Sequence, residues 1–564
     1  MRKKILFTAI FLLFLLLLLT SPAVSADASA QLKQAETLTE GGQYQQAEQI
    51  YRQIVADNPR TDYAFQAQKG LAIVYVRWDK PAETEAAFGQ LRANYSDHRD
   101  FSGAVCVIGD NYRWKGMDEK ARQMYQIAVE GISGSEAIWP KTGVAITSIR
   151  LRDYQTADPL TQQILTDFAG DERLATACCL IADAYRSTRH HRQAIDLYQY
   201  VIDNHGDSEY AMWSQMGIAI SNIDLGKKDV AESAIEKLRA NYGTHPSFYK
   251  AIRDIGDNYR WRDIHDKARE MYDLALPGLS GSEAFWPKAG IAIASVHLKD
   301  YKTAEALTEQ ILTEFAVHPQ LPQAICLIGG AYRSVQDYDK ALGLYQLILE
   351  AWPRNEQALW TRAGMARIAI ALGDEAGGVE VMDDMIVDFK DNPVLPAAVW
   401  AVAEEYYNLA LRYEKQDLDA KAEEYFAKVI STGETTLKQW PDSAAGREIF
   451  HICAVCYGRL HEYAKAIEYY QKVVDEWPDY EYAWQAQFMV GRTYEYLKRS
   501  GAIPKTDAES LIRAAYQRVL WYYPDSPAAR ASANWFKYHQ YADESQVGAD
   551  RPNRDGHSRK GEEK

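Results

Sequence analysis

The sequence predicts an all-α fold, a right-handed α-solenoid of about 13 helix-turn-helix units with a C-terminal capping helix. A long internal duplication is the first observation: the residues IGDNYRW begin at Ile108 and recur 147 positions later, at Ile255. A shorter step lies inside it, because a Gly or Ala recurs every 34 to 39 residues from Gly70 to Ala403. Repeats of about 20–50 residues are typical of solenoids and propellers. The apolar residues within each step follow helical spacing, which favours the solenoid.

The unit from 447 to 478 shows how one step becomes two helices. Phe450, Ala454 and Tyr457 lie at i, i+4 and i+7, on one face of a first helix, and Ala466 and Tyr470 lie at i, i+4 on a second. Small residues at these positions let the two helices approach closely, so we expect them to be packing residues. Gly109 and Gly256 occupy the position of Ala454 in their own units.

Together with Pro478, which ends the second helix, these residues resemble the tetratricopeptide repeat, a 34-residue helix pair. The resemblance covers nearly the whole chain after residue 26. It implies a superhelical groove, lined by the first helix of each pair, that binds a protein or peptide. Alternate units keep the small residue but lack the Tyr of the first helix; they begin near Trp139, Trp213, Trp286 and Trp360. The turns of sequence PDS resemble those of exported bacterial members of the family.

Three segments are expected: a signal peptide at 1–26, the solenoid at 27–541 and a disordered polar tail at 542–564. The first segment has three basic residues, an apolar run from Ile5 to Leu19 and small residues before a cleavage site at Ala26. Cleavage there predicts export to the periplasm or cell surface, and an uncleaved anchor is the alternative. No other segment is apolar enough to span a membrane.

Charge excludes two classes of partner. The chain has a net charge of −15, and removing Arg2, Lys3 and Lys4 with the signal peptide makes it −18. Nucleic acid and anionic membranes are therefore not expected as partners. The sequence does not give the oligomeric state.

Two irregular units and six cysteines have structural interpretations. The spacing of 51 between Ala403 and Ala454 predicts longer helices or an extended loop near Arg412, and an insert surrounds Gly501.

Four cysteines share one register near the middle of first helices, where we expect them to be buried, free and part of the core; they are Cys106, Cys179, Cys326 and Cys453. No enzyme motif occurs, so no catalytic residue, cofactor or metal is expected.

A row of arginines is the candidate ligand-binding site. Four alternate units have Arg after the Tyr of the first helix, and in two of them Trp follows; the residues are Arg113, Trp114, Arg186, Arg260, Trp261 and Arg333. If this position faces the groove, as the family resemblance implies, the row would bind carboxylates of an acidic or extended peptide. The alternative is internal pairing with Asp110, Asp183 and Asp257, three residues earlier on the same helices. Arg333 has Gly330 at that place.

These observations predict a non-enzymatic exported scaffold that binds a protein or peptide in the groove. The alternative is a carbohydrate-binding or envelope-polysaccharide export protein, because 37 Tyr and 14 Trp supply rings on which sugars stack. Most of these rings occupy packing positions, which favours the scaffold.

Overall fold

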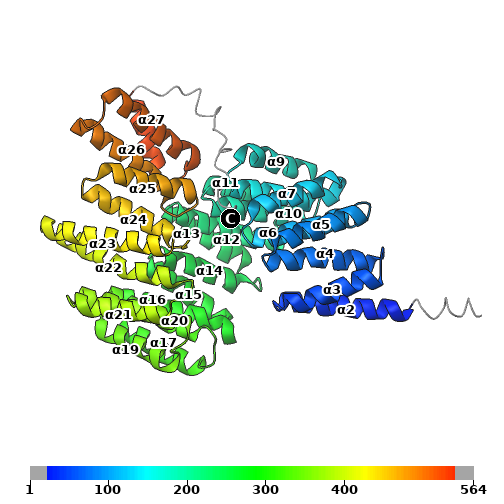
Figure 1. Cartoon of the computed structure of the whole chain (residues 1–564), viewed down its shortest axis with the longest axis horizontal. Helices are drawn as coiled ribbons and strands as arrows, with labels where there is room; N and C mark the ends of the chain where they lie inside the picture. Colours follow the sequence, from blue (N-terminus) through cyan, green and yellow to red (C-terminus); the bar gives the residue numbers. More distant parts are fainter. Residues whose placement is uncertain (1–21, 540–564) are drawn as a thin grey trace, which may run out of the picture. The chain divides into compact units, whose positions relative to one another are not determined.

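The computed structural model describes residues 22–539, which contain twenty-seven α-helices, three short 3-10 helices and no strand. In chain order, α2 to α27 are twenty-six helices, as thirteen helix-turn-helix units require, and α28 follows them (Figure 1). The prediction of an all-α helical repeat solenoid of about 13 units with a closing helix is confirmed.

The described part divides into two compact units, one ending at Thr188 and the other starting at Arg189. The first unit contains α2 Pro22–Glu40, α3 Tyr44–Asp57, α4 Asp62–Arg77, α5 Pro81–Tyr95, α6 Phe101–Trp114, α7 Asp118–Glu130, η1 Gly134–Ala137, α8 Ile138–Arg150, α9 Tyr154–Asp167 and α10 Leu174–Ser187. The prediction of one continuous solenoid over 27–541 stays a prediction.

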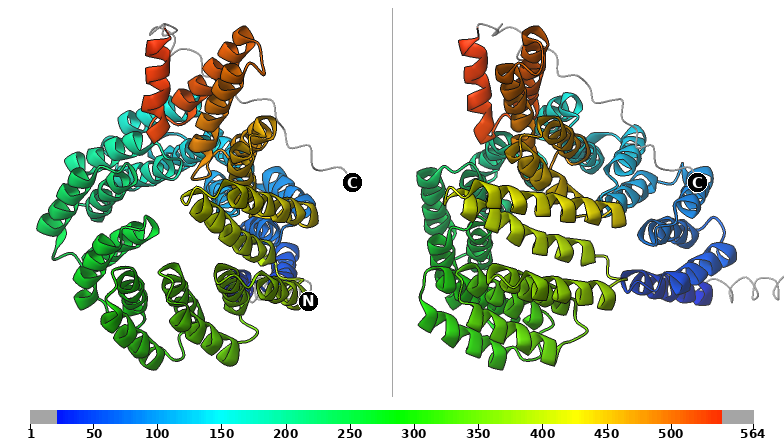
Figure 2. Two further views of the ribbon diagram at one scale, coloured as in Figure 1. Left: turned by 90° about the vertical axis from the view of Figure 1, so that its left-hand side faces the viewer. Right: turned by 60° about the vertical axis from the view of Figure 1, so that its left-hand side comes forward.

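The second unit begins with α11 His191–Asn204, α12 Glu209–Asp224, α13 Lys228–Tyr242, α14 Phe248–Trp261, α15 His265–Ala275, η2 Leu276–Gly278, η3 Gly281–Ala284, α16 Phe285–His297, α17 Tyr301–Glu314, α18 Leu321–Ser334 and α19 Tyr338–Ala351. It continues with α20 Glu356–Ala371, α21 Glu375–Asp388, α22 Leu395–Glu414, α23 Asp419–Gln439, α24 Gly446–Arg459, α25 Tyr463–Glu476, α26 Ala483–Ser500, α27 Lys505–Tyr522 and α28 Pro527–Tyr538. Along α22 to α27 each helix packs on the next one in the chain (Figures 1 and 2).

Both ends of the chain carry predictions that the structure does not test. Residues 22–26 of the predicted signal peptide open α2, and the rest of it lies outside the described residues. The predicted tail at 542–564 also lies outside them. None of the helices within 22–539 combines the length and apolarity that a bilayer crossing needs.

In three helix pairs, a buried tyrosine ring on the second helix packs against the first helix of its own pair and the first helix of the next pair. Tyr125 on α7 lies against Gly109 of α6 and Gly143 of α8, and a Cβ at these glycines would approach its ring to 2.9 and 2.5 Å. The second unit repeats this contact twice, with Tyr272 and then Tyr345 each placed between two glycines. The prediction that Gly109 and Gly256 are packing residues is confirmed, and the contact is with the tyrosine ring.

The extra residues of the irregular units lengthen their helices. Between Ala403 and Ala454 the chain forms α22 and α23, of 20 and 21 residues, so longer helices rather than an extended loop explain the spacing. Arg412 lies in the last turn of α22 and donates to Glu405 at 3.0 Å. Gly501 ends α26 in the left-handed conformation, with φ 74°, which glycine adopts without steric cost.

The cysteines and the closing helix agree with the sequence in most respects. All six cysteines are free, and Cys179 and Cys453 are buried as predicted. Cys106 and Cys326 pack against core residues but are only part-buried, so the prediction of burial is wrong for these two. The closing helix starts at Pro527 as expected and packs on α27.

Two adjacent glycines on α18 test the packing. A Cβ at Gly329 would lie 2.7 Å from the ring of Tyr345, whereas a Cβ at Gly330 would meet nothing within 4 Å. We expect Gly329→Ala to destabilise the second unit by about 1–3 kcal/mol through overpacking. Gly330→Ala should stabilise it by about 0.5–1 kcal/mol, because alanine has the higher helix propensity. Thermal unfolding shows whether each variant raises or lowers the unfolding temperature. Equal changes in the unfolding temperature of the two variants would contradict the assigned contact.

Candidate functional site

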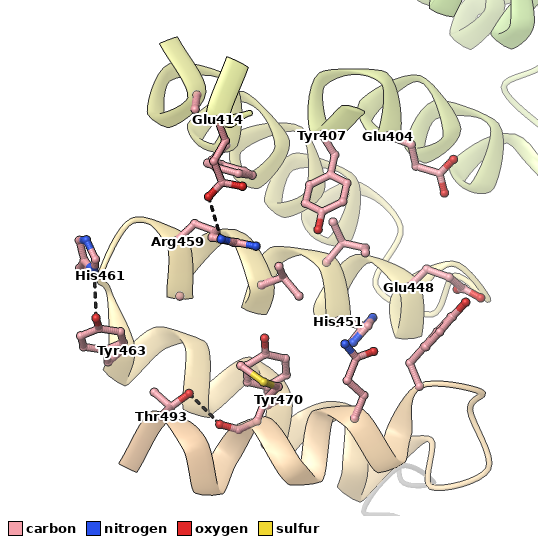
Figure 3. A pocket seen from close by; sticks show the side chains of 18 of the residues that line it. Glu404, Tyr407, Glu414, Glu448, His451, Arg459, His461, Tyr463, Tyr470 and Thr493 are labelled. Atoms are coloured by element: carbon pink, nitrogen blue, oxygen red, sulfur yellow. Dashed lines mark hydrogen bonds and ion pairs between the residues drawn. The ribbon is translucent and has the colours of Figure 1, made fainter. Parts of the chain in front are cut away.

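A cavity with a volume of about 1160 Å³ lies in the second unit and is lined by α22, α23, α24, α25 and α26 (Figure 3). Helix α24 runs the length of this cavity and presents Glu448, His451, Val455 and Arg459 to it. Their spacing places them on one helical face. Between them, Cys453 and Cys456 are buried and belong to the core. The alternation of core and cavity residues along α24 therefore builds the wall of the site.

The lining is acidic and aromatic. Six carboxylates face one arginine, Arg459; the acidic residues are Glu404, Glu414, Asp419, Glu423, Glu448 and Glu481. Seven aromatic rings complete the surface: Tyr407, Phe426, Tyr463, Tyr470, Tyr480, Tyr482 and Tyr496. Figure 3 shows Glu414, Arg459 and His461 at one end of the cavity and Glu404, Glu448 and His451 at the other.

Pairing of the carboxylates differs between them. Glu414 accepts from Arg459 at 2.7 Å, and Glu404 lies 3.3 Å from Arg367 outside the cavity. Burial raises the pKa of Glu404. The exposed Asp419 and Glu423 make no ion pair with any residue in the described part of the chain. The cavity thus keeps negative charge that its own neighbours leave uncompensated.

Glu481 connects the cavity with the beginning of the second unit. Its carboxylate lies 3.7 Å from Arg189 and 3.8 Å from Arg262, which precede it by more than 200 residues in the chain. A second long-range pair joins Arg192 to Asp525 at 2.9 Å. Glu481 of the cavity is therefore held by Arg262, the residue that follows α14, and by Arg189, which precedes α11.

His451 forms part of the cavity wall and lacks hydrogen-bond partners. Its side chain is 4% exposed and stacks on Tyr482, with ring centroids 5.4 Å apart. Tyr470 and Tyr480 lie close to the same ring, at 6.2 and 5.8 Å. Neither ring nitrogen has a hydrogen-bond partner among residues 22–539. Burial lowers the pKa of His451 to about 4, so its imidazole is neutral at neutral pH.

Two arginines of the predicted row, Arg113 and Arg260, lie against tyrosines that join the repeats. Arg113 donates to the hydroxyl of Tyr125 at 3.2 Å and to Asp110 at 3.2 Å. That hydroxyl donates to Asp110 at 2.7 Å, so the three side chains form a closed network. In the second unit Arg260, Tyr272 and Asp257 repeat the arrangement.

The other two arginines of the row also have acidic neighbours. Arg186 donates to Asp183 at 3.3 Å. Arg333, which has no aspartate three residues earlier, lies 3.7 Å from Glu405 of α22. Side chains of the row are 18–30% exposed. The geometry therefore favours internal pairing, while a role of the row in ligand binding stays a prediction.

Trp114 and Trp261 are placed differently from the arginines. They end α6 and α14 and are 71% and 72% exposed. Arg77 lies over the first ring and Arg260 over the second, each 5.9 Å from the centroid. Neither tryptophan lines the α22–α26 cavity.

Sequence reasoning missed the cavity because its residues look ordinary in sequence. Scattered Glu and Asp on helix faces read as solvated, and the tyrosines occupy packing positions. The available signal was the spacing of Glu448, His451, Val455 and Arg459 on one face of α24. No group of three or more His, Cys, Asp or Glu that could hold a metal ion occurs in the part of the chain that the structure describes.

Titration of His451 gives a measurable contribution to stability. Because its pKa falls from 6.5 to about 4 on folding, the unfolded chain binds more protons between these pH values. Stability should therefore fall as the pH drops from about 6.5 to 4, by on the order of 2–3 kcal/mol from this group. Thermal unfolding of His451→Phe over the same range should lose this part of the pH dependence. Parallel curves for both proteins would show that His451 titrates normally.

Replacing the arginine row separates internal pairing from ligand binding. Arg260→Gln should destabilise the second unit by about 1–3 kcal/mol, because hydrogen bonds to charged groups contribute this much. The control Lys465→Gln removes an exposed cation paired with Glu468 and should change stability by less than about 0.5 kcal/mol. The variant with Arg113, Arg186, Arg260 and Arg333 all changed to Gln should unfold at lower temperature. A stable quadruple variant that fails to bind its partner would instead support a groove role.

Comparisons with known proteins agree with the repeat pattern. The family model described as tetratricopeptide repeat matches residues 29–61 and 454–480. A search of curated proteins gives no match.

Several solved structures overlap the chain at low identity. PilF of Pseudomonas aeruginosa is 15% identical, with 40% of this chain and 97% of that chain covered and a TM-score of 0.28. The apo form of RapI is 12% identical, with coverages of 73% and 99% and a TM-score of 0.38. A Rap protein complexed with competence and sporulation factor is 14% identical, with coverages of 58% and 97% and a TM-score of 0.30.

Because these TM-scores lie below 0.5, the assignment rests on the matched segments and on the helix pairs themselves. The matched segments include α3 and α25, whose Ala and Tyr residues pack as the repeat requires; these are Ala47, Tyr51, Ala466 and Tyr470. The chain thus contains segments that match the tetratricopeptide repeat, at residues 29–61 and 454–480.

Proposed function

We propose that the chain is an exported, non-enzymatic scaffold that binds a protein or peptide partner in its groove. The observation that carries the proposal is the α22–α26 cavity, which brings together charged groups, tyrosines and a histidine that has no hydrogen-bond partner among residues 22–539. Repeats of this family support protein interactions. Several tyrosines are fully buried in the core, which leaves fewer rings for sugars and favours the scaffold over carbohydrate binding; they are Tyr125, Tyr198, Tyr272, Tyr470 and Tyr516.

A photo-crosslinking amino acid placed in the cavity tests the binding of a partner. Gly458 lines the cavity, and a Cβ added there would meet nothing within 4 Å, so p-benzoylphenylalanine at this position should be tolerated. Irradiation of cells that produce the full chain should give discrete cross-linked species, identified by mass spectrometry. The same amino acid at Glu468, which is exposed and does not line the cavity, is the control. Equal cross-linking at both positions would contradict a partner in the cavity.

Export is supported by the basic residues, apolar run and small residues at 1–26. N-terminal sequencing of the protein from its producing cell should begin at Asp27, and the protein should fractionate outside the cytoplasm. Protein that keeps Met1 and is found in the membrane fraction would show that the segment is an uncleaved anchor, and the export proposal would be wrong.

A further inference from the structure

We propose that the α22–α26 cavity binds a short, extended cationic peptide segment. A lysine or arginine side chain of the segment pairs with Asp419 and Glu423, and one of its peptide groups hydrogen-bonds to His451. This inference rests on the proposed scaffold function and specifies the chemistry of the partner.

The charge of the cavity selects a cation. Six carboxylates and one arginine line it, and Asp419 and Glu423 have exposed carboxylates with no ion pair in the described part of the chain. Asp419 and Glu423 lie at i, i+4 on α23, where like charges repel, and a bound cation relieves the repulsion. An acidic peptide would add to it.

The second requirement comes from His451 at the opposite end. A neutral imidazole has one N–H donor and one acceptor nitrogen, and both nitrogens are buried here without a partner. Leaving a buried polar atom unsatisfied costs about 1–3 kcal/mol. The backbone of an extended peptide offers both C=O and N–H groups, so it can accept from the ring N–H or donate to the other ring nitrogen, whereas a simple polyamine offers donors only. His451 therefore favours a peptide over a small cation.

The dimensions of the cavity set the length of the segment. Glu448 and Arg459 mark its two ends along α24 and are eleven residues apart, or about 16 Å at the rise of an α-helix. An extended chain covers about 3.3 Å per residue, so about five residues fit. Tyr407 and Tyr470 lie between these two ends (Figure 3) and provide apolar surface for the central side chain.

The binding experiment uses the full chain and three probes. Fluorescein-labelled Lys-Ala-Leu-Ala-Lys amide should bind in an anisotropy titration, with affinity that falls at least tenfold between 50 and 300 mM NaCl, as expected for charge pairing. Glu-Ala-Leu-Ala-Glu amide with the same label should bind at least tenfold more weakly. Equal binding of the two peptides would overturn the proposal. Spermidine that displaces the lysine peptide at or below the peptide's own Kd would overturn it too, because the site would then be one for polyamines.

Variants of the cavity locate the binding. The double variant Asp419→Asn, Glu423→Gln should bind the lysine peptide at least tenfold more weakly. Its unfolding temperature should change little, because both residues are exposed. The matched control Glu424→Gln changes the neighbouring carboxylate, which pairs with Lys428 and does not line the cavity. It should leave the affinity unchanged. Equal losses in both variants would contradict the assigned site.

His451→Phe separates recognition from structure. Removing an unsatisfied buried polar ring should keep or raise the unfolding temperature at pH 7, yet binding should fall at least tenfold. His451→Gln, which retains a donor and an acceptor, should recover part of the affinity. Full affinity in a folded His451→Phe protein would overturn the role of this residue.

Cross-linking through residue 458 distinguishes failure of this inference from failure of the scaffold function. If synthetic acidic and neutral pentapeptides cross-link as efficiently as the lysine peptide, the cationic preference is wrong, but the proposed scaffold function still stands. If neither peptides nor cellular proteins cross-link there, both the inference and the proposed function fall.

Discussion

A tyrosine ring held between two glycines is the contact on which the regular repeats depend. The Tyr125 ring leaves no room for a Cβ at Gly109 or Gly143, so the small residues set how closely three successive helices approach. Burial and the nearby Asp110 raise the pKa of Tyr125, and its hydroxyl is satisfied by Asp110 and Arg113. A buried hydroxyl needs such partners. The polar residues of this network are therefore a consequence of placing a tyrosine, rather than a phenylalanine, at the helix crossing.

The sequence could predict the features that depend on local spacing, but not the contacts between separate helices. Spacing of small and aromatic residues was enough for the number of helix pairs and for the closing helix, because these features depend on local periodicity. The partners of the arginines were harder to assign. Asp110 was visible three residues before Arg113, but Tyr125 comes from the next helix and Glu405 reaches Arg333 from α22.

The candidate site was hidden for a related reason. Its carboxylates are spread from Glu404 to Glu481, and only packing brings α22, α24 and α26 around one volume. His451 occupies a helix position where a core residue would be expected, and its missing partners become evident only when the neighbouring side chains are placed. Glu481 adds a dependence on residues near the beginning of the second unit, Arg189 and Arg262, which no local pattern contains.

The tyrosine contact also limits how the length of the array can change. In α7, α15 and α19 the residue four positions after the helix Ala is Tyr, whereas in the alternate second helices α9 and α17 it is Thr161 and Thr308. Excision of the α18–α19 pair, for example, would place the Thr308 helix next to Gly364, which accommodates the Tyr345 ring, and would leave a void. Excision or duplication of two pairs keeps every ring with its glycines. The chain is thus modular in steps of two helix pairs, and its 147-residue duplication, four pairs long, fits that rule.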